Sequence, residues 1–265
     1  MMLLSWWISL AVTFLPQQPG NRSGAQGGVN VEPEANRVLN ALLEAHGWRR
    51  FNRVCEATSW QAVGTMTLAG NKMTFQTDWI QVDFTEADAT LTLHQTPQRK
   101  VTVRTYLNGR GGWRVVGDNT KEQLSAEAAQ PENQEDAFLH WLLWGKGLLT
   151  VRNNGQFALR LLTEPIQVGN RPAQGLQIQR RGYPTARLYY DTETNLLVMV
   201  AVSKEGGAGL ELYPRKYRAQ EGIQVPQEFT VRRQGKEFIT GELTAWKTLE
   251  QKPVMGQEQA APPIP

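Results

Sequence analysis

From Trp60 onward, apolar and polar residues alternate in short segments, and this pattern limits the fold more than any other feature of the chain. The first segment places Ala62, Gly64, Met66 and Leu68 on one side of a strand, because side chains with period two share a face. The connections are too short for crossover helices, so the sequence predicts an antiparallel meander. Further strands are expected at 72–77, 80–84, 91–93, 101–105 and 113–116.

A second set of alternating segments runs from about Phe157 to Leu249. Arg187–Tyr190 and Leu197–Val200 are two of its strands, and Asp191–Asn195 joins them as a hairpin turn. Between the two sets, Lys121–Gln130 favours a helix. We therefore expect a mainly β protein with few helices, built from two meanders.

Two helices are predicted outside the strands. Glu34–His46 has its apolar residues on one helical face, and Gly47 follows at the usual position of a C-terminal cap. Pro131 is well placed to begin the second helix, which contains Phe138–Trp144. That run is apolar on nearly every side, so it must be covered by protein or by a ligand.

The N-terminal segment predicts export. Met2–Pro16 carries no charge and is shorter than the roughly 20 residues that span a bilayer, which fits the apolar region of a secretory signal. We expect residues 1–25 to be a signal peptide, 26–33 a linker, 34–250 the folded domain and 251–265 a disordered tail. The expected location is periplasmic or secreted, and the alternative is an N-terminal membrane anchor.

Composition argues against several functions. The 28 basic and 25 acidic residues are spread along the chain, without the basic cluster typical of nucleic-acid binding. Cys55 is the single cysteine, and the three histidines at 46, 94 and 140 lack metal-ligand spacing. His46 is expected to favour a helix C-terminus through its positive charge. We expect neither a metal nor a cofactor.

Catalytic patterns are also missing. The sequence has no nucleophile elbow, zinc-protease motif or phosphate-binding glycine loop, and Gly206–Gly209 predicts a flexible turn. Glu86 and Asp88 could form an acid/base pair, but a solvated turn is favoured for them. Asp191, Glu193 and Asn195 lack the later glycine and glutamate of a calcium loop. We therefore expect a protein that is not an enzyme.

Large apolar side chains offer the candidate binding residues. Individually each could belong to the core, but together they could enclose a space for an acyl chain. The candidates for a cavity and its lid are Met66, Phe75, Trp79, Phe84, Trp113, Phe138, Trp141 and Trp144.

Two segments carry a resemblance to a known group. Ala186–Leu197 is similar to a strand–turn–strand motif, and Tyr217–Pro226 to a tyrosine–glycine–proline motif, of the LolA/LolB superfamily of periplasmic lipoprotein carriers. A basic hairpin tip, Arg232–Lys236, follows the second motif. The resemblance implies a curved, half-open antiparallel β-barrel with a helical lid over an apolar cavity. It does not assign Arg104 the role of the arginine that governs release in such carriers.

The resemblance implies two functions. The first is a non-catalytic periplasmic carrier that binds a lipid or the acyl part of a lipoprotein. The alternative is an envelope sensor or structural module that recognises a partner protein with the same scaffold.

Overall fold

One antiparallel sheet of 13 strands dominates the part of the chain described by the computed structural model, residues 32–51, 54–68, 70–96, 99–109, 111–117, 119–125, 127–203 and 209–256. The strands follow one another along the chain, with two meanders joined in the middle of the sheet. They are β1 (Ala57–Leu68), β2 (Asn71–Gln81), β3 (Glu86–Thr96), β4 (Arg99–Asn108), β5 (Gly112–Val116), β6 (Glu122–Gln123), β7 (Ala158–Val168), β8 (Arg171–Gln179), β9 (Thr185–Asp191), β10 (Leu197–Ser203), β11 (Leu210–Gln220), β12 (Ile223–Arg233) and β13 (Lys236–Leu249).

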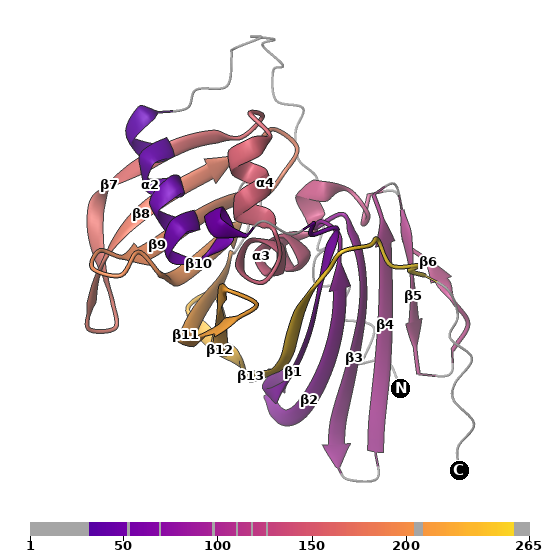
Figure 1. Ribbon diagram of the computed structural model, residues 1–265. Helices are drawn as coiled ribbons and strands as arrows, with labels where there is room; N and C mark the ends of the chain where they lie inside the picture. Colours follow the sequence, from indigo (N-terminus) through magenta and orange to yellow (C-terminus); the bar gives the residue numbers. More distant parts are fainter. Residues whose placement is uncertain are drawn as a thin grey trace, which may run out of the picture.

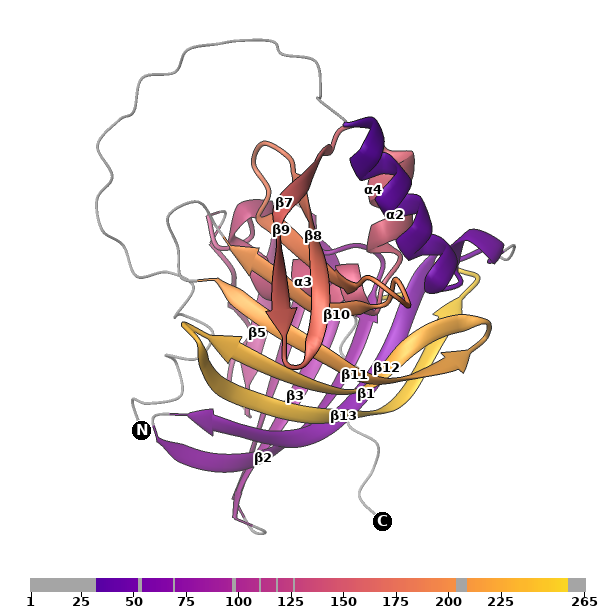
Figure 2. The same cartoon turned by 90° about the vertical axis from the view of Figure 1, so that its left-hand side faces the viewer.

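The junction between the meanders pairs the first strand with the last. Strand β1 lies between β2 and β13, and Trp60 stands opposite Trp246 in the register. The outermost strands of the sheet, β6 and β7, do not pair with each other, so the sheet is not closed. Figures 1 and 2 show that it is strongly curved. The expectation of a mainly β, curved and half-open antiparallel barrel is confirmed.

The region after β2 differs from the expected strand pattern. Strand β2 is continuous to Gln81, and residues 82–85 form a bend. Asp83 fixes this bend, because its Oδ1 accepts hydrogen bonds from the backbone N–H groups of Thr85 (2.6 Å) and Glu86 (3.0 Å). The predicted strand over 80–84 is therefore wrong.

The acidic residues that follow this bend lie in the next strand. Glu86 and Asp88 belong to β3 rather than to a solvated turn, which corrects the prediction from the sequence. Asp88 is buried, and its carboxylate accepts two hydrogen bonds from Arg104, at 3.0 and 2.7 Å. A strand with a paired acid replaces the expected loop.

Helix α2 (Pro33–Ala45) agrees with the predicted helix and buries one apolar face. It ends where Gly47 adopts a φ of +83°. A Cβ atom at this position would lie 2.1 Å from the carbonyl oxygen of Gly222. Gly47 is thus required both by its left-handed backbone and by close contact with the β11–β12 turn.

The helical interruption differs from the prediction in two places. The described residues of the segment 121–130 form no helix, because β6 pairs with β5 and the Leu124 N–H donates to the Gly112 carbonyl at 2.9 Å. Pro131 opens a short 3₁₀ helix, η2 (Pro131–Asn133), before α3 (Glu135–Leu143).

Two further helical elements complete the described structure. Helix α4 (Gly147–Asn153) follows α3, and the 3₁₀ helix η1 (Trp48–Arg50) follows α2. Helices α2 and α4 lie together over the β7–β10 part of the sheet, whereas α3 lies between the two halves (Figures 1 and 2). No helix among the described residues is both long enough and apolar enough to cross a bilayer.

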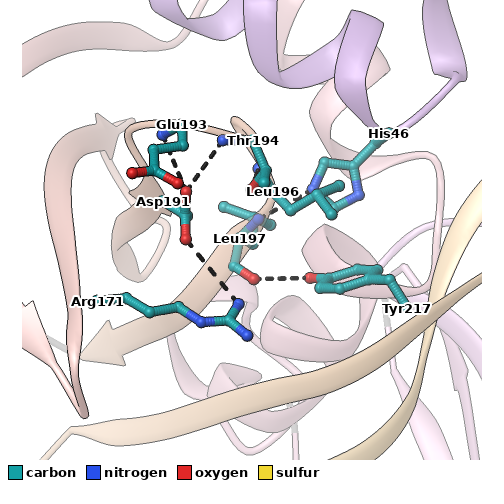
Figure 3. Close-up of polar contacts among 8 residues, drawn as sticks. All are labelled: His46, Arg171, Asp191, Glu193, Thr194, Leu196, Leu197 and Tyr217. Atoms are coloured by element: carbon teal, nitrogen blue, oxygen red, sulfur yellow. Dashed lines mark hydrogen bonds and ion pairs between the residues drawn. The ribbon is translucent and has the colours of Figure 1, made fainter.

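A buried set of contacts, which we call the His46 latch, fastens the end of α2 to the second meander (Figure 3). His46 Nε2 accepts the Leu197 N–H at 3.2 Å, and its Nδ1 lies 3.4 Å from the Gln224 carbonyl oxygen. Tyr217 donates its hydroxyl to the Leu197 carbonyl at 2.9 Å and packs edge-on against the imidazole. Because Nε2 accepts, Nδ1 carries the proton and donates to Gln224.

The latch corrects the role expected for His46. The side chain is buried, and burial lowers the pKa of His46 to about 4, partly opposed by the bond to Gln224. The residue is therefore neutral near pH 7 and does not act as a positive charge at the helix end. Its function is to join three backbone segments.

The two motifs that carry the resemblance both contribute residues to the His46 latch. The first contains the β9–β10 hairpin turn, in which Asp191 Oδ1 accepts the N–H groups of Glu193 (2.9 Å) and Thr194 (3.0 Å) (Figure 3). The bond from Thr194 is the main cause that lowers the pKa of Asp191. The second motif begins with Tyr217. Both motifs meet at Leu197, so they have a structural role.

Some predictions fall on other parts of the chain. The signal peptide (1–25), most of the linker, residues 206–208 of the glycine turn and residues 257–265 of the tail lie outside the described residues. Residues 251–256, the first part of the predicted tail, contact β3. Lys252 forms an ion pair with Glu86 at 2.5 Å, and the Gly256 N–H donates to Asp88 Oδ2 at 3.1 Å.

Candidate functional site

A cavity of about 270 Å³ lies between the inner face of the first meander, strands β12 and β13, and the segment that begins α3. This volume is close to the lower end of the range for small-molecule sites, about 300 Å³. Most of its wall is apolar. The lining side chains are Trp60, Met66, Phe75, Thr77, Trp79, Ala87, Ala89, Leu91, Val103, Thr105, Leu107, Arg114, Leu124, Ala128, Asn133, Gln134, Asp136, Ala137, His140, Phe229, Val231, Arg233, Phe238 and Ile239.

Small residues on β3 create the space. Ala89 stands opposite Trp79 in the β2–β3 register, and Ala87 stands opposite Gln81. Both alanines face the cavity, because residues two apart share one side of a strand. A methyl group beside a long side chain leaves a volume that a larger residue would fill.

Helix α3 covers the cavity and is attached to the sheet at both ends. Gln81 Nε2 donates to the Ala137 carbonyl at 2.7 Å, and Trp246 Nε1 donates to the Trp144 carbonyl at 2.8 Å. Both bonds are buried. The helix is therefore a fixed cover rather than a segment held by apolar contacts alone.

His140 is the part of α3 that enters the aromatic wall. Its ring lies 5.0 Å from that of Trp60 and 4.7 Å from that of Trp79, edge-on in both cases. Its Nδ1 is buried and has no hydrogen-bond partner among the described residues, whereas Nε2 lies 3.7 Å from Asp136. Burial lowers the pKa of His140, and the Asp136 carboxylate partly opposes this shift.

Arg114 brings a charged group to the same cavity from β5. Its Nε is buried without a hydrogen-bond partner within the described parts of the chain. Burial lowers the pKa of Arg114, and the nearby Glu122 carboxylate raises it. Asp136 and Arg233 also line the cavity, and both are exposed, so the space reaches the surface.

The structure brings three of the eight candidate residues to the cavity, namely Met66, Phe75 and Trp79. They come from β1 and β2, on faces set by the alternation read from the sequence. Their role in ligand binding stays a proposal. Most of the cavity wall is formed by the inner face of the sheet.

The candidates on α3 lie in the protein interior instead. Phe138, Trp141 and Trp144 are each at most 2% exposed, and none lines the cavity. Phe84 packs with the first two, its ring 4.8 Å from that of Phe138 and 5.2 Å from that of Trp141. Trp144 packs against Trp60 at 4.7 Å. Protein, rather than an open space, covers this apolar helix.

Trp113 lies on the opposite face of the sheet from the cavity. Its ring packs 5.7 Å from that of Tyr106, and the Arg104 guanidinium lies 5.3 Å above it. Arg104 is on this outer face with Asp88. Arg104 therefore does not line the cavity.

Sequence reasoning missed the polar residues of the cavity. Arg114 directly follows Trp113, so the two side chains must lie on opposite faces of β5. The prediction that Trp113 faces the cavity therefore implied that Arg114 faces away from it. Asp136 and His140 are four residues apart and share one face of α3. That spacing was a usable signal for a polar strip on an otherwise apolar helix.

No group of three or more possible metal ligands is found among the described residues. The chemistry of the cavity is that of an apolar container with an arginine, a buried histidine and an exposed carboxylate.

Comparison with known proteins bears on the fold. A DUF1329 family protein from Desulfovibrio piger aligns with a TM-score of 0.51 and 11% identity, over 83% of this chain and 93% of that one. A putative outer membrane lipoprotein-sorting protein domain from Vibrio parahaemolyticus aligns with a TM-score of 0.50 and 9% identity, over 85% and 95%. The fold is LolA-like.

The LolA-like fold agrees with the resemblance found in the sequence. A LolA superfamily protein from Nitrosomonas europaea also aligns, with a TM-score of 0.49 and 11% identity over 81% of this chain and 94% of that one. No family model matches the chain, and no curated protein is significantly similar to it in sequence. At these identities the comparison concerns architecture alone.

Proposed function

We propose that this protein is a non-catalytic, exported binding protein that holds an apolar chain, such as the acyl part of a lipid or lipoprotein, in the cavity under α3. The observation that supports this most strongly is the cavity of about 270 Å³ with a largely apolar wall. It reaches the surface at Asp136 and Arg233, so a ligand can enter without unfolding the sheet.

The LolA-like fold adds support of a weaker kind. One similar structure is described as a putative outer membrane lipoprotein-sorting domain, and a shared fold raises the prior for a related role without assigning it. The alternative is an envelope module that recognises a partner protein. Native mass spectrometry of protein purified from its own cells distinguishes the two, because a carrier should retain a lipid and a module should retain a protein.

A cavity-filling variant provides the direct test. Ala89→Trp places an indole in the space opposite Trp79, and we expect it to weaken binding of a fluorescent fatty acid at least tenfold. The matched control is Val63→Trp, which adds the same side chain at a position 39% exposed on the outer face of β1. Equal binding by both variants and the parent would contradict the proposed site.

A further inference from the structure

Arg114 is a partly buried, charged side chain on the wall of the largely apolar cavity. It stands opposite Thr105 in the β4–β5 register, and both side chains line the space. Its Nε is buried without a hydrogen-bond partner among the described residues. A buried donor on a charged group is costly when no acceptor is present.

Neither Glu122 nor Asp136 supplies that acceptor in the described structure. Glu122 faces Arg114 across the β5–β6 register but is exposed, and no ion pair within 4.0 Å joins them in the described structure. Asp136 is the carboxylate on the cavity wall, with 63% of its side chain exposed, and it lies 3.7 Å from His140. Both acids are exposed, so water screens their charge, and the Glu122 carboxylate only partly opposes the effect of burial on the pKa of Arg114.

We infer that the ligand of this cavity is an alkyl chain with an anionic oxygen headgroup, a carboxylate or phosphate, and that Arg114 binds the headgroup. This inference rests on the proposed function. The apolar wall around Met66, Phe75 and Trp79 would hold the chain. A guanidinium donates two parallel hydrogen bonds to such a headgroup, and the Thr105 hydroxyl lies on the same wall as a further donor.

The experiment compares ligands that share a chain and differ in the head. Dodecanoate, dodecyl phosphate and dodecanol are titrated by calorimetry, with acetate and inorganic phosphate as heads without a chain. We expect the parent protein to bind both anions at least tenfold more tightly than dodecanol, a difference of about 1.4 kcal/mol. Acetate and phosphate should bind far more weakly than the chain-bearing anions.

Two variants assign the headgroup to a residue. Arg114→Gln should raise the Kd of both chain-bearing anions about tenfold and leave dodecanol within twofold, which also shows that the cavity is intact. The matched control is Arg187→Gln. Arg187 lies on β9, is exposed and does not line the cavity, so its loss should change each Kd less than threefold.

The possible contrary results point to different errors. If dodecanol binds as tightly as dodecanoate, the headgroup inference is wrong while chain binding stands. If Arg187→Gln weakens the binding of the anions as much as Arg114→Gln does, the assignment to Arg114 is wrong. Equal loss of all three chain ligands in Arg114→Gln would make Arg114 a structural residue. If no chain-bearing compound binds the parent, the proposed function itself fails.

Discussion

The His46 latch makes the stability of this protein depend on pH in a defined window. In the unfolded chain a histidine has a pKa of about 6.5, whereas burial lowers the pKa of His46 to about 4 in the folded protein. The unfolded state therefore binds a proton first as the pH falls. Stability from this residue is complete above about pH 7, is lost between about pH 6.5 and 4, and changes little below that.

The size of the effect follows from the two pKa values. At 1.36 kcal/mol per pH unit, the full shift corresponds to about 3 kcal/mol, of which about 2 kcal/mol is lost between pH 7 and pH 5. This is a large share of the 5–15 kcal/mol typical of a domain. The main cause is the desolvation of the buried ring, and a protonated ring also cannot accept the Leu197 N–H at Nε2.

The assay is urea unfolding followed by tryptophan fluorescence at pH 7, 6 and 5, for the parent and for His46→Gln. Other titrating groups are shared, so the difference in unfolding free energy between the two proteins isolates residue 46. We expect this difference to shrink by about 2 kcal/mol from pH 7 to pH 5. Parallel curves, with a constant difference at all three pH values, would refute the reasoning.

Tyr217→Phe is the matched control. It removes the hydroxyl bond to the Leu197 carbonyl but no group that titrates below pH 7, since burial raises the pKa of Tyr217 well above its usual value. Its cost should be about 1 kcal/mol and the same at pH 7 and pH 5. A pH-dependent cost in this variant would show that the latch responds as a whole rather than through the imidazole.

Two further predictions follow from the core helix and from the N-terminus. Trp141→Ala should lower the unfolding free energy by about 3–5 kcal/mol, because it truncates a core side chain. Trp141→Leu should leave fatty-acid binding unchanged, because the indole is buried in protein and does not line the cavity. Variants that are only slightly destabilised but bind fatty acid more weakly would contradict this prediction. The uncharged Met2–Pro16 segment predicts that residues 1 to about 25 are absent from the mature protein. N-terminal sequencing of the native protein checks this prediction, and a mature chain that starts at Met1 or Met2 would contradict it.

The strand pattern was predictable because it is local. Alternation in β1 and in the β9–β10 hairpin follows from two-residue periodicity and turn chemistry within a few neighbouring residues. The end of β2 was not predictable in this way. Val82 and Phe84 continue the alternation, but Asp83 accepts two backbone N–H groups and turns the chain there. A side chain that bonds its own backbone overrode the apolar pattern.

His46 shows a second limit of sequence reasoning. Its position at the end of α2 suggested a favourable positive charge, which is a property of an isolated helix. The structure buries the ring between β10 and β11–β12, more than 150 residues away in sequence. Desolvation then outweighs the helix dipole, and the neutral form is favoured. Only the tertiary arrangement decides which effect is larger.

The cavity itself illustrates why only three of the candidate residues line it. Large apolar side chains were selected because they contact apolar ligands, yet in a packed protein the same side chains fill space. Phe138, Trp141 and Trp144 do so, closing the interior around α3. The space arises where alanines of β3 stand opposite Trp79 and Gln81. Since this depends on the register between two strands, the informative signal is a small residue paired with a large one, and it becomes visible only when the pairing is known.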